Sequence, residues 1–207
     1  MDTLNVWRDL PAAGHPDGRT LASEARDFHE WHLGRPHFAV WAIPIDDTRV
    51  QRRLDEVRTA LHPLLLPGDE RQPHITIQIC GFPVRQECRP ADFTPAQLQA
   101  QVGAIAHLAP ASFRLHIGGA FSFLSAPCLA VSGNGLRTLH DLWRPEARPL
   151  MHDRWIPHVT AGLYRHAWPM ADIERRLQAL ADLPPIELEI RALEWMSYDC
   201  RRIDGPL

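Results

Sequence analysis

Two short segments, residues 73–80 (PHITIQIC) and residues 157–161 (PHVTA), share the pattern Pro-His, a β-branched residue and Thr. Both segments are rich in residues that favour strands. Their histidines, His74 and His158, are 84 residues apart and fall at the same place in a repeated order of strands and helices. This match of composition, order and position predicts that the two segments are equivalent strands of a duplicated fold.

Side chains alternate across a strand, so each segment is predicted to have one aliphatic face and one polar face. On the first strand, His74, Thr76 and Gln78 are expected on one side and the three isoleucines on the other. On the second strand, His158 and Thr160 are expected to share a face in the same way. Each strand is therefore predicted to bury its aliphatic side and to present an imidazole and a hydroxyl on the other.

Two imidazoles and two hydroxyls that converge from related lobes suit a phosphodiester substrate. A neutral imidazole can accept a proton from an attacking water or hydroxyl, and a protonated one can donate to the leaving oxygen. Threonine hydroxyls can donate hydrogen bonds to the non-bridging phosphoryl oxygens. The alternative interpretation is that these are ordinary strand histidines, with threonines beside them because threonine favours strands.

Strand-like and helix-like segments follow one another in the order βαβαβ, and this order occurs twice. The expected strands cover residues 37–45, 74–80, 113–123, 128–133, 155–164 and 186–198. The expected helices cover residues 46–65, 94–108, 135–144 and 170–183. The first of these helices has its apolar residues at helical spacing, at Val50, Leu54, Val57 and Leu61. The second begins with Thr94, Pro95 and Gln97, which are typical of a helix N-terminus.

The repeated order predicts an α+β fold that is a bilobal, pseudo-twofold duplication. Antiparallel sheets would flank a central cleft, with helices outside. Residues 1–36 are less regular, with one short helix expected over residues 21–33, and are assigned to an N-terminal extension. Residues 37–207 form a single domain whose lobes cover about 37–123 and 124–207, and an exchange of strands between the lobes is left open.

The chain of 207 residues contains 22 arginines and no lysine. This excludes chemistry that needs a lysine amine, such as Schiff-base catalysis, a P-loop and the lysyl-nucleotide of ATP-dependent ligases. The 12 histidines supply groups that titrate near neutral pH. Positive contacts to a substrate must therefore come from arginine or from protonated histidine.

The remaining composition bears on location and partners. The formal net charge of −3 argues against an extended nucleic-acid surface, because such surfaces need many cationic phosphate contacts. The four cysteines form no CxxC pair, and the N-terminus lacks the pattern of a secretion signal, so a cytoplasmic protein is expected. No stretch approaches the roughly 18 apolar residues of a membrane span, so no membrane partner is expected.

Over residues 37–198 the chain resembles the two-histidine (2H) phosphoesterases, which include 2'-5' RNA ligases and cyclic phosphodiesterases. The resemblance lies in the motifs PHITI and PHVTA, the opening strand and helix, and the closing EWMSY strand. It implies a metal-free hydrolase without a cofactor that acts on 2',3'-cyclic phosphates or 2'-5' linkages. Its partner would be a small nucleotide or an RNA end, and the protein would be a monomer. Without lysine, any RNA joining would have to be the reverse of cyclic-phosphate opening.

By motif match, the resemblance assigns catalysis to His74 and His158 and phosphate binding to Thr76 and Thr160. The further candidates come from strand parity. Arg154 has the parity of His158 and is a candidate phosphate contact, with a solvated charge at the strand end as the alternative.

Two aromatic residues are candidates for stacking on a base, and one more arginine lies near the first motif. Trp41 shares a strand face with His37, and Tyr164 follows the His158 face, although packing in the core is an alternative for both. Arg71 lies three residues before His74, but Pro73 leaves the direction of its side chain open.

Two other functions compete with catalysis by the histidine pair. A noncatalytic protein that binds nucleotides or RNA ends would use the same cleft. A metal hydrolase would use His29 and His32, which are spaced to share a helix face, although no further ligands complete the site.

Overall fold

The computed structural model describes residues 18–68, 70–143, 155–202 and 204–207. The helices of this part of the chain are α3 (His29–His32), α4 (Thr48–Leu61), α5 (Pro95–Leu108), α6 (Asn134–Leu142) and α7 (Met170–Ala181). The strands are β1 (His37–Pro44), β2 (His74–Pro83), β3 (Asp92–Phe93), β4 (Phe113–Ser122), β5 (Pro127–Ser132), β6 (His158–Thr160), β7 (Ile186–Ile190) and β8 (Glu194–Asp199). None of these helices is long and apolar enough to cross a membrane.

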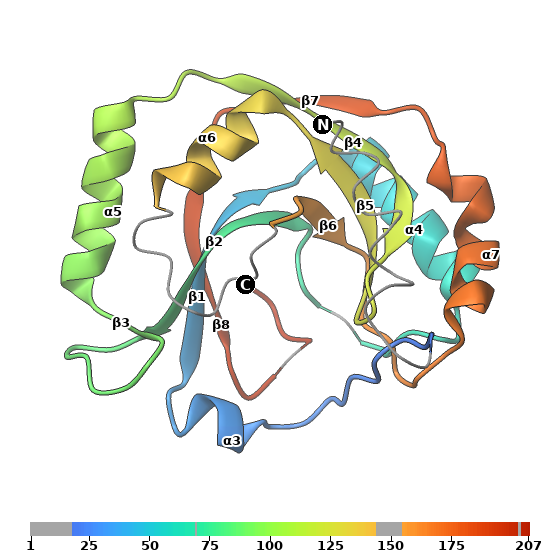
Figure 1. Ribbon diagram of the computed structural model, residues 1–207, viewed down its shortest axis with the longest axis horizontal. Coiled ribbons are helices and arrows are strands. Elements are labelled where there is room, and N and C mark those ends of the chain that lie inside the picture. Colours follow the sequence, from blue (N-terminus) through green and yellow to red (C-terminus); the bar gives the residue numbers. More distant parts are fainter. Residues whose placement is uncertain (1–17, 69, 144–154, 203) are drawn as a thin grey trace.

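The strands form two four-stranded sheets, with the orders β3-β2-β1-β8 and β6-β5-β4-β7 (Figure 1). Neighbouring strands are antiparallel, except that the short β3 runs parallel to β2. The predicted α+β class with two antiparallel sheets is therefore confirmed.

Each half of the chain gives its last strand to the sheet of the other half. The strand β4 pairs with β5 and β7 in the second sheet, whereas β8 pairs with β1 in the first. The strand expected over residues 186–198 is thus two strands, β7 and β8, which belong to different sheets. This is the exchange of strands that the sequence left open, because the periodicity of a strand does not reveal which sheet it joins.

The helices pack as their sequences predict. In α4 the residues Val50, Leu54, Val57 and Leu61 are all fully buried. The helix α5 begins at Thr94 with a capping box, in which the threonine side chain accepts from the backbone N–H of Gln97 and the Gln97 side chain accepts from the backbone N–H of Thr94. A single core cluster includes residues of β1, β2, β4, β5 and the helices α4, α6 and α7, so the two sheets share one core.

Residues 18–36 run along one edge of the molecule, from the start of α7 to α3 and on to β1 (Figure 1). Just before α7, the backbone N–H of Thr20 donates to the Trp168 carbonyl at 2.8 Å, and the Trp168 N–H donates to the Thr20 hydroxyl at 2.8 Å. At the first sheet, the Trp31 ring packs against Phe38 and Phe82, with both centroid distances 5.0 Å. The short helix expected over residues 21–33 is reduced to the four residues of α3, because this segment is held by contacts with other elements.

Candidate active site

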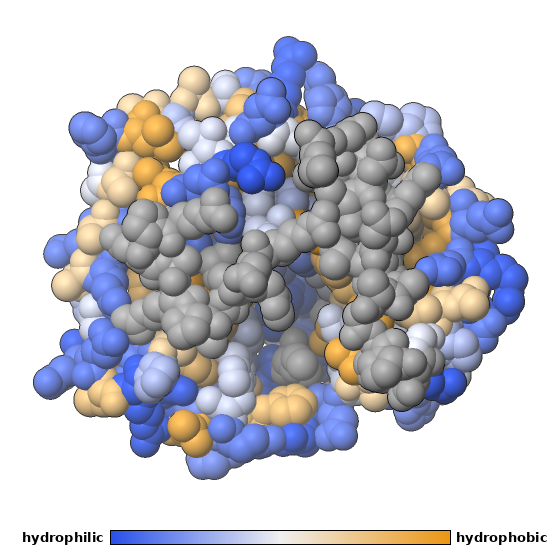
Figure 2. Space-filling model, viewed as in Figure 1, coloured by the Kyte–Doolittle hydropathy of each residue, from blue (hydrophilic) through white to orange (hydrophobic). Residues whose placement is uncertain are grey.

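The two motif strands, β2 and β6, lie beside each other near the centre of the molecule (Figure 1). The indole N–H of Trp155, just before β6, donates to the Thr76 carbonyl of β2 at 3.2 Å. His140 of α6 stacks on Trp155 at 4.2 Å, and its Nδ1 lies 3.0 Å from the Ile77 carbonyl. These hydrogen-bond and stacking contacts hold the second motif against the first. Figure 2, drawn from the same side as Figure 1, shows a hollow near the middle of the molecule with hydrophilic atoms at its floor.

His74 and His158 have the same hydrogen-bonding geometry. The Nδ1 atom of His74 lies 2.8 Å from the Gln72 carbonyl, and Nδ1 of His158 lies 2.7 Å from the Ile156 carbonyl. A carbonyl oxygen can only accept, so each Nδ1 must carry a hydrogen. Each neutral imidazole therefore has its lone pair on Nε2, where it can accept a proton from a substrate or water.

The surroundings favour the neutral form of both histidines. Burial lowers the pKa of His74, the bond to the Gln72 carbonyl raises it, and the charges of Arg71 and His158 lower it further, so that the net direction is down. Burial also lowers the pKa of His158, against an opposing effect of its bond to the Ile156 carbonyl. A bound anion would reverse this trend, because a nearby negative charge stabilises an imidazolium.

The threonines of the motifs lie on their strands as the sequence predicts, half-buried like the histidines. Thr76 lies opposite Ala42 of β1, and Thr160 lies opposite Cys128 of β5, whose thiol is 4.0 Å from the Thr160 hydroxyl. Each strand thus presents an imidazole and a hydroxyl two residues apart on one face.

A bulge in β2 corrects the predicted position of Gln78. Thr76 pairs with Ala42 and Gln78 pairs with Trp41, so Ile77 has no partner on β1. The extra residue shifts the alternation by one, as a β-bulge does. Gln78 is consequently buried with only 3% of its surface exposed, whereas Ile79 is partly exposed. The polar face therefore ends at Thr76.

Neither aromatic residue proposed to stack on a base is free to do so. Trp41 is 6% exposed, its indole N–H donates to Gln101 at 2.7 Å, and its ring stacks on Trp143 at 5.5 Å. The prediction was wrong because β1 is buried on both faces, so its composition did not reveal which face lines the cleft.

Tyr164 is fully buried, and its hydroxyl shares a hydrogen bond of 2.6 Å with the Ser122 hydroxyl. Burial raises its pKa well above the ordinary value for tyrosine. The prediction assumed a strand through residue 164, but β6 ends at Thr160, and parity with His158 is lost beyond that point.

Of the two arginine candidates near the motifs, Arg71 lies in the described part of the chain. Arg154 lies outside the described residues. Arg71, whose direction the sequence left open, lies over the Tyr198 ring of β8 with its guanidinium carbon 4.0 Å from the ring centroid. Its charge also acts on His74. Tyr198 belongs to the EWMSY strand, but only the pairing of β8 with β1 brings it to this site.

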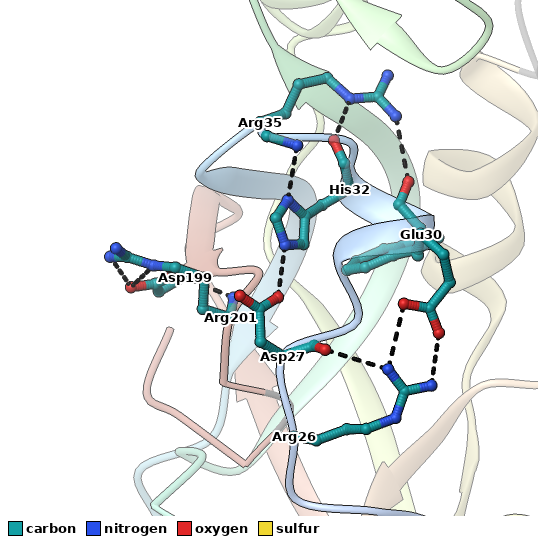
Figure 3. Close-up of polar contacts among 9 residues, drawn as sticks. Arg26, Asp27, Glu30, His32, Arg35, Asp199 and Arg201 are labelled. Atoms are coloured by element: carbon teal, nitrogen blue, oxygen red, sulfur yellow. Dashed lines mark hydrogen bonds and ion pairs between the residues drawn. The ribbon is translucent and has the colours of Figure 1, made fainter.

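The candidate metal pair is engaged in other bonds. His32 Nε2 lies 2.6 Å from an Asp27 carboxylate oxygen, and its Nδ1 accepts from the Gly34 backbone N–H at 3.0 Å (Figure 3). Both ring nitrogens of His32 are therefore occupied, and its ring contacts that of His29 at 5.2 Å. Within the described ranges, no three His, Cys, Asp or Glu side chains group as a metal site.

Two sheets that exchange strands around a pair of His-x-Thr strands form the fold of a two-histidine phosphoesterase. The chain belongs to the 2'-5' RNA ligase superfamily, whose family model matches residues 46–202. The resemblance found in the motifs is thereby confirmed, and membership indicates an enzyme of the phosphodiesterase type.

Solved structures with similar folds include TT0787 of Thermus thermophilus, at 16% identity and a TM-score of 0.50, covering 80% of this chain and 99% of that one. E. coli LigT complexed with 3'-AMP is 12% identical with a TM-score of 0.49, covering 79% and 98%. LigT complexed with NADP+ is 14% identical with a TM-score of 0.45, at the same coverage. No curated protein matches the chain.

Proposed function

We propose that the protein is a metal-independent phosphodiesterase that opens 2',3'-cyclic phosphates or cleaves 2'-5' linkages at the end of a nucleotide or RNA. The observation that carries this proposal is that His74 and His158 make the same hydrogen bond. Both imidazoles bond through Nδ1 to a carbonyl two residues earlier, which leaves both Nε2 atoms for proton transfer.

In the proposed reaction, one neutral imidazole accepts a proton from water at Nε2 as the water oxygen attacks phosphorus. The new P–O bond forms while the P–O bond to one ribose oxygen breaks. The other histidine, protonated, donates its proton to that ribose oxygen, which leaves as a hydroxyl. The two histidines thus exchange protonation states, and proton exchange with solvent restores them. The positive charge of Arg71 favours neutral His74, the form required of a base.

Charge on the phosphoryl group needs stabilisation while these protons move. The hydroxyls of Thr76 and Thr160 lie on the same strand faces as the histidines and can donate to the non-bridging oxygens. Arg71 adds a guanidinium near His74, held in place by the ring of Tyr198. The substrate anion would raise the pKa of the histidine that must be protonated.

The test is hydrolysis of 2',3'-cyclic nucleotides and of RNA oligomers with cyclic-phosphate ends, in the presence of EDTA. His74→Ala and His158→Ala should each lower kcat at least about a hundredfold, as loss of a general acid or base does. His107→Ala is the matched control, because His107 is an exposed residue in the last turn of α5. Undiminished turnover in either motif variant would refute the proposal. A ligand that raises Tm but stays intact would instead indicate a noncatalytic binding protein.

A further inference from the structure

A cavity of about 680 Å³ lies next to His158, and the mechanism above does not use it. Its wall includes Trp155 and Pro157, which lead directly into β6. The rest of the wall comes from the start of β4, the end of β5 and the first turn of α6, and includes Phe113, His116, Ser132 and Arg137.

The register of the second sheet places this cavity in line with the active site. His158 pairs with Ala130 of β5, and Ser132 lies two residues further along the same face. His116 of β4 pairs with Ser132. Since two residues of a strand span about 7 Å, the cavity begins about 7 Å from the catalytic histidine on one continuous sheet face. A substrate extended beyond its reacting phosphate would reach the cavity directly.

The groups around the cavity suit a nucleotide. Arg137 is exposed and makes no hydrogen bond or ion pair within the described part of the chain, so its guanidinium is free to meet a phosphate. Arg114 and His116 also line the cavity, but both contact Glu187, at 3.0 and 3.5 Å.

Aromatic rings complete the wall. Trp155 is half-buried and stacked on His140, which fixes the plane of its ring. Phe113 lies against Gly135, where an added Cβ would come within 2.3 Å of the ring, so this close contact requires glycine. Rigid aromatic rings beside a guanidinium are the combination that single-stranded nucleic acids bind, by stacking and charge.

We propose that this cavity is a subsite for the second nucleotide of the substrate, the neighbour of the nucleotide that carries the reacting phosphodiester. Arg137 contacts the phosphate of this second nucleotide. The preferred substrate is then an oligonucleotide end rather than a mononucleotide. The inference rests on the proposed function in assigning catalysis to His74 and His158. A single cationic subsite also agrees with the net charge of −3, which argues against an extended nucleic-acid surface.

The test compares two substrates, a 2',3'-cyclic mononucleotide and a dinucleotide with a 2',3'-cyclic phosphate end. Arg137→Ala should lower kcat/KM for the dinucleotide about tenfold, the effect of losing one exposed charged hydrogen bond, and leave the mononucleotide unchanged. The matched control is Arg175→Ala, which removes an exposed arginine of α7. Equal losses on both substrates, or no loss on the dinucleotide, would overturn the subsite.

Binding separates failure of the subsite from failure of the catalytic proposal. Calorimetric titration with 3'-phosphorylated mono- and dinucleotides needs no turnover. The wild type should bind the dinucleotide about tenfold more tightly, and Arg137→Ala should abolish this preference. If the wild type cleaves neither substrate but shows the preference, the proposed function fails and the subsite stands. Equal affinity for both ligands in the wild type would refute the subsite.

Discussion

Replacing Arg35 with alanine should destabilise the protein strongly, because it breaks a buried ion pair between the N-terminal segment and the first sheet. Arg35 Nη1 lies 2.7 Å from Asp92, and the two side chains are 12% and 3% exposed. The guanidinium also lies 3.6 Å from the centroid of the Phe82 ring. Removing it deprives the buried Asp92 carboxylate of this ion pair.

The cost should be about 3 kcal/mol, at the lower end for a broken buried pair, because Asp92 keeps hydrogen bonds from the backbone N–H groups of Cys88 and Arg89. For a chain of this size, that corresponds to a fall in Tm of roughly 6–12 °C. Urea and thermal unfolding followed by circular dichroism measure both quantities.

The matched control is Arg201→Ala, since Arg201 forms an ion pair with Asp199 close by, but its side chain is 61% exposed (Figure 3). Exposed pairs contribute little, so this variant should unfold almost as the wild type does. Similar losses in the Arg35 and Arg201 variants would refute the reasoning that burial makes the first pair important.

The pH dependence provides a second check on Asp92. Burial alone would raise its pKa, but bonds from the Cys88 N–H and Arg35 outweigh this and hold the pKa below its ordinary value. Such a carboxylate stabilises the fold above its unfolded pKa of about 3.9, and the contribution is lost as the pH falls further. The difference between wild type and Arg35→Ala should therefore shrink below about pH 4.

Three further variants test the packing and the site. Gly119→Ala should lower the free energy of unfolding by about 3 kcal/mol or more, because its Cβ would lie 1.9 Å from a carbonyl at the end of α7. Gly103→Ala, in open space on α5, should raise it by about 0.5–1 kcal/mol. Urea unfolding that shows both variants shifted in the same direction would contradict this. Tyr164→Phe should cost about 1 kcal/mol and leave kcat/KM unchanged, so a selective loss of activity would restore a role in base binding. The pKa of His158 is lowered in the folded state, so the unfolded state binds the proton more readily and the wild type should lose stability as the pH falls through about 6.5. His158→Gln should remove this part of the loss when unfolding is compared at about pH 7.5 and about pH 5.5.

Local features of the site could be predicted from the sequence because they depend on neighbours along the chain. Each histidine opens its strand directly after a proline, and the threonine two residues later lies on the same strand. Strand parity then places imidazole and hydroxyl together without knowledge of the rest of the fold. The capped start of α5 and the buried side of α4 are local in the same sense.

Features that depend on distant partners could not be predicted this way. The sequence left Trp41 between the cleft and the core, because its surroundings depend on which elements cover β1; Gln101 and Trp143 cover that side. Arg71 gains its place at the site from Tyr198, which the exchange of β8 into the first sheet brings there.

By itself, the sequence determined the candidate catalytic groups: two His-x-Thr strands in a duplicated order, in a chain without lysine. Only the tertiary structure decided which faces those strands share, because the bulge at Ile77 turns Gln78 into the core. It also decided that each half gives a strand to the other half's sheet, and that residues 18–36 join the segment before α7 to the first sheet. These features follow from register and packing between distant segments, which local propensity does not encode.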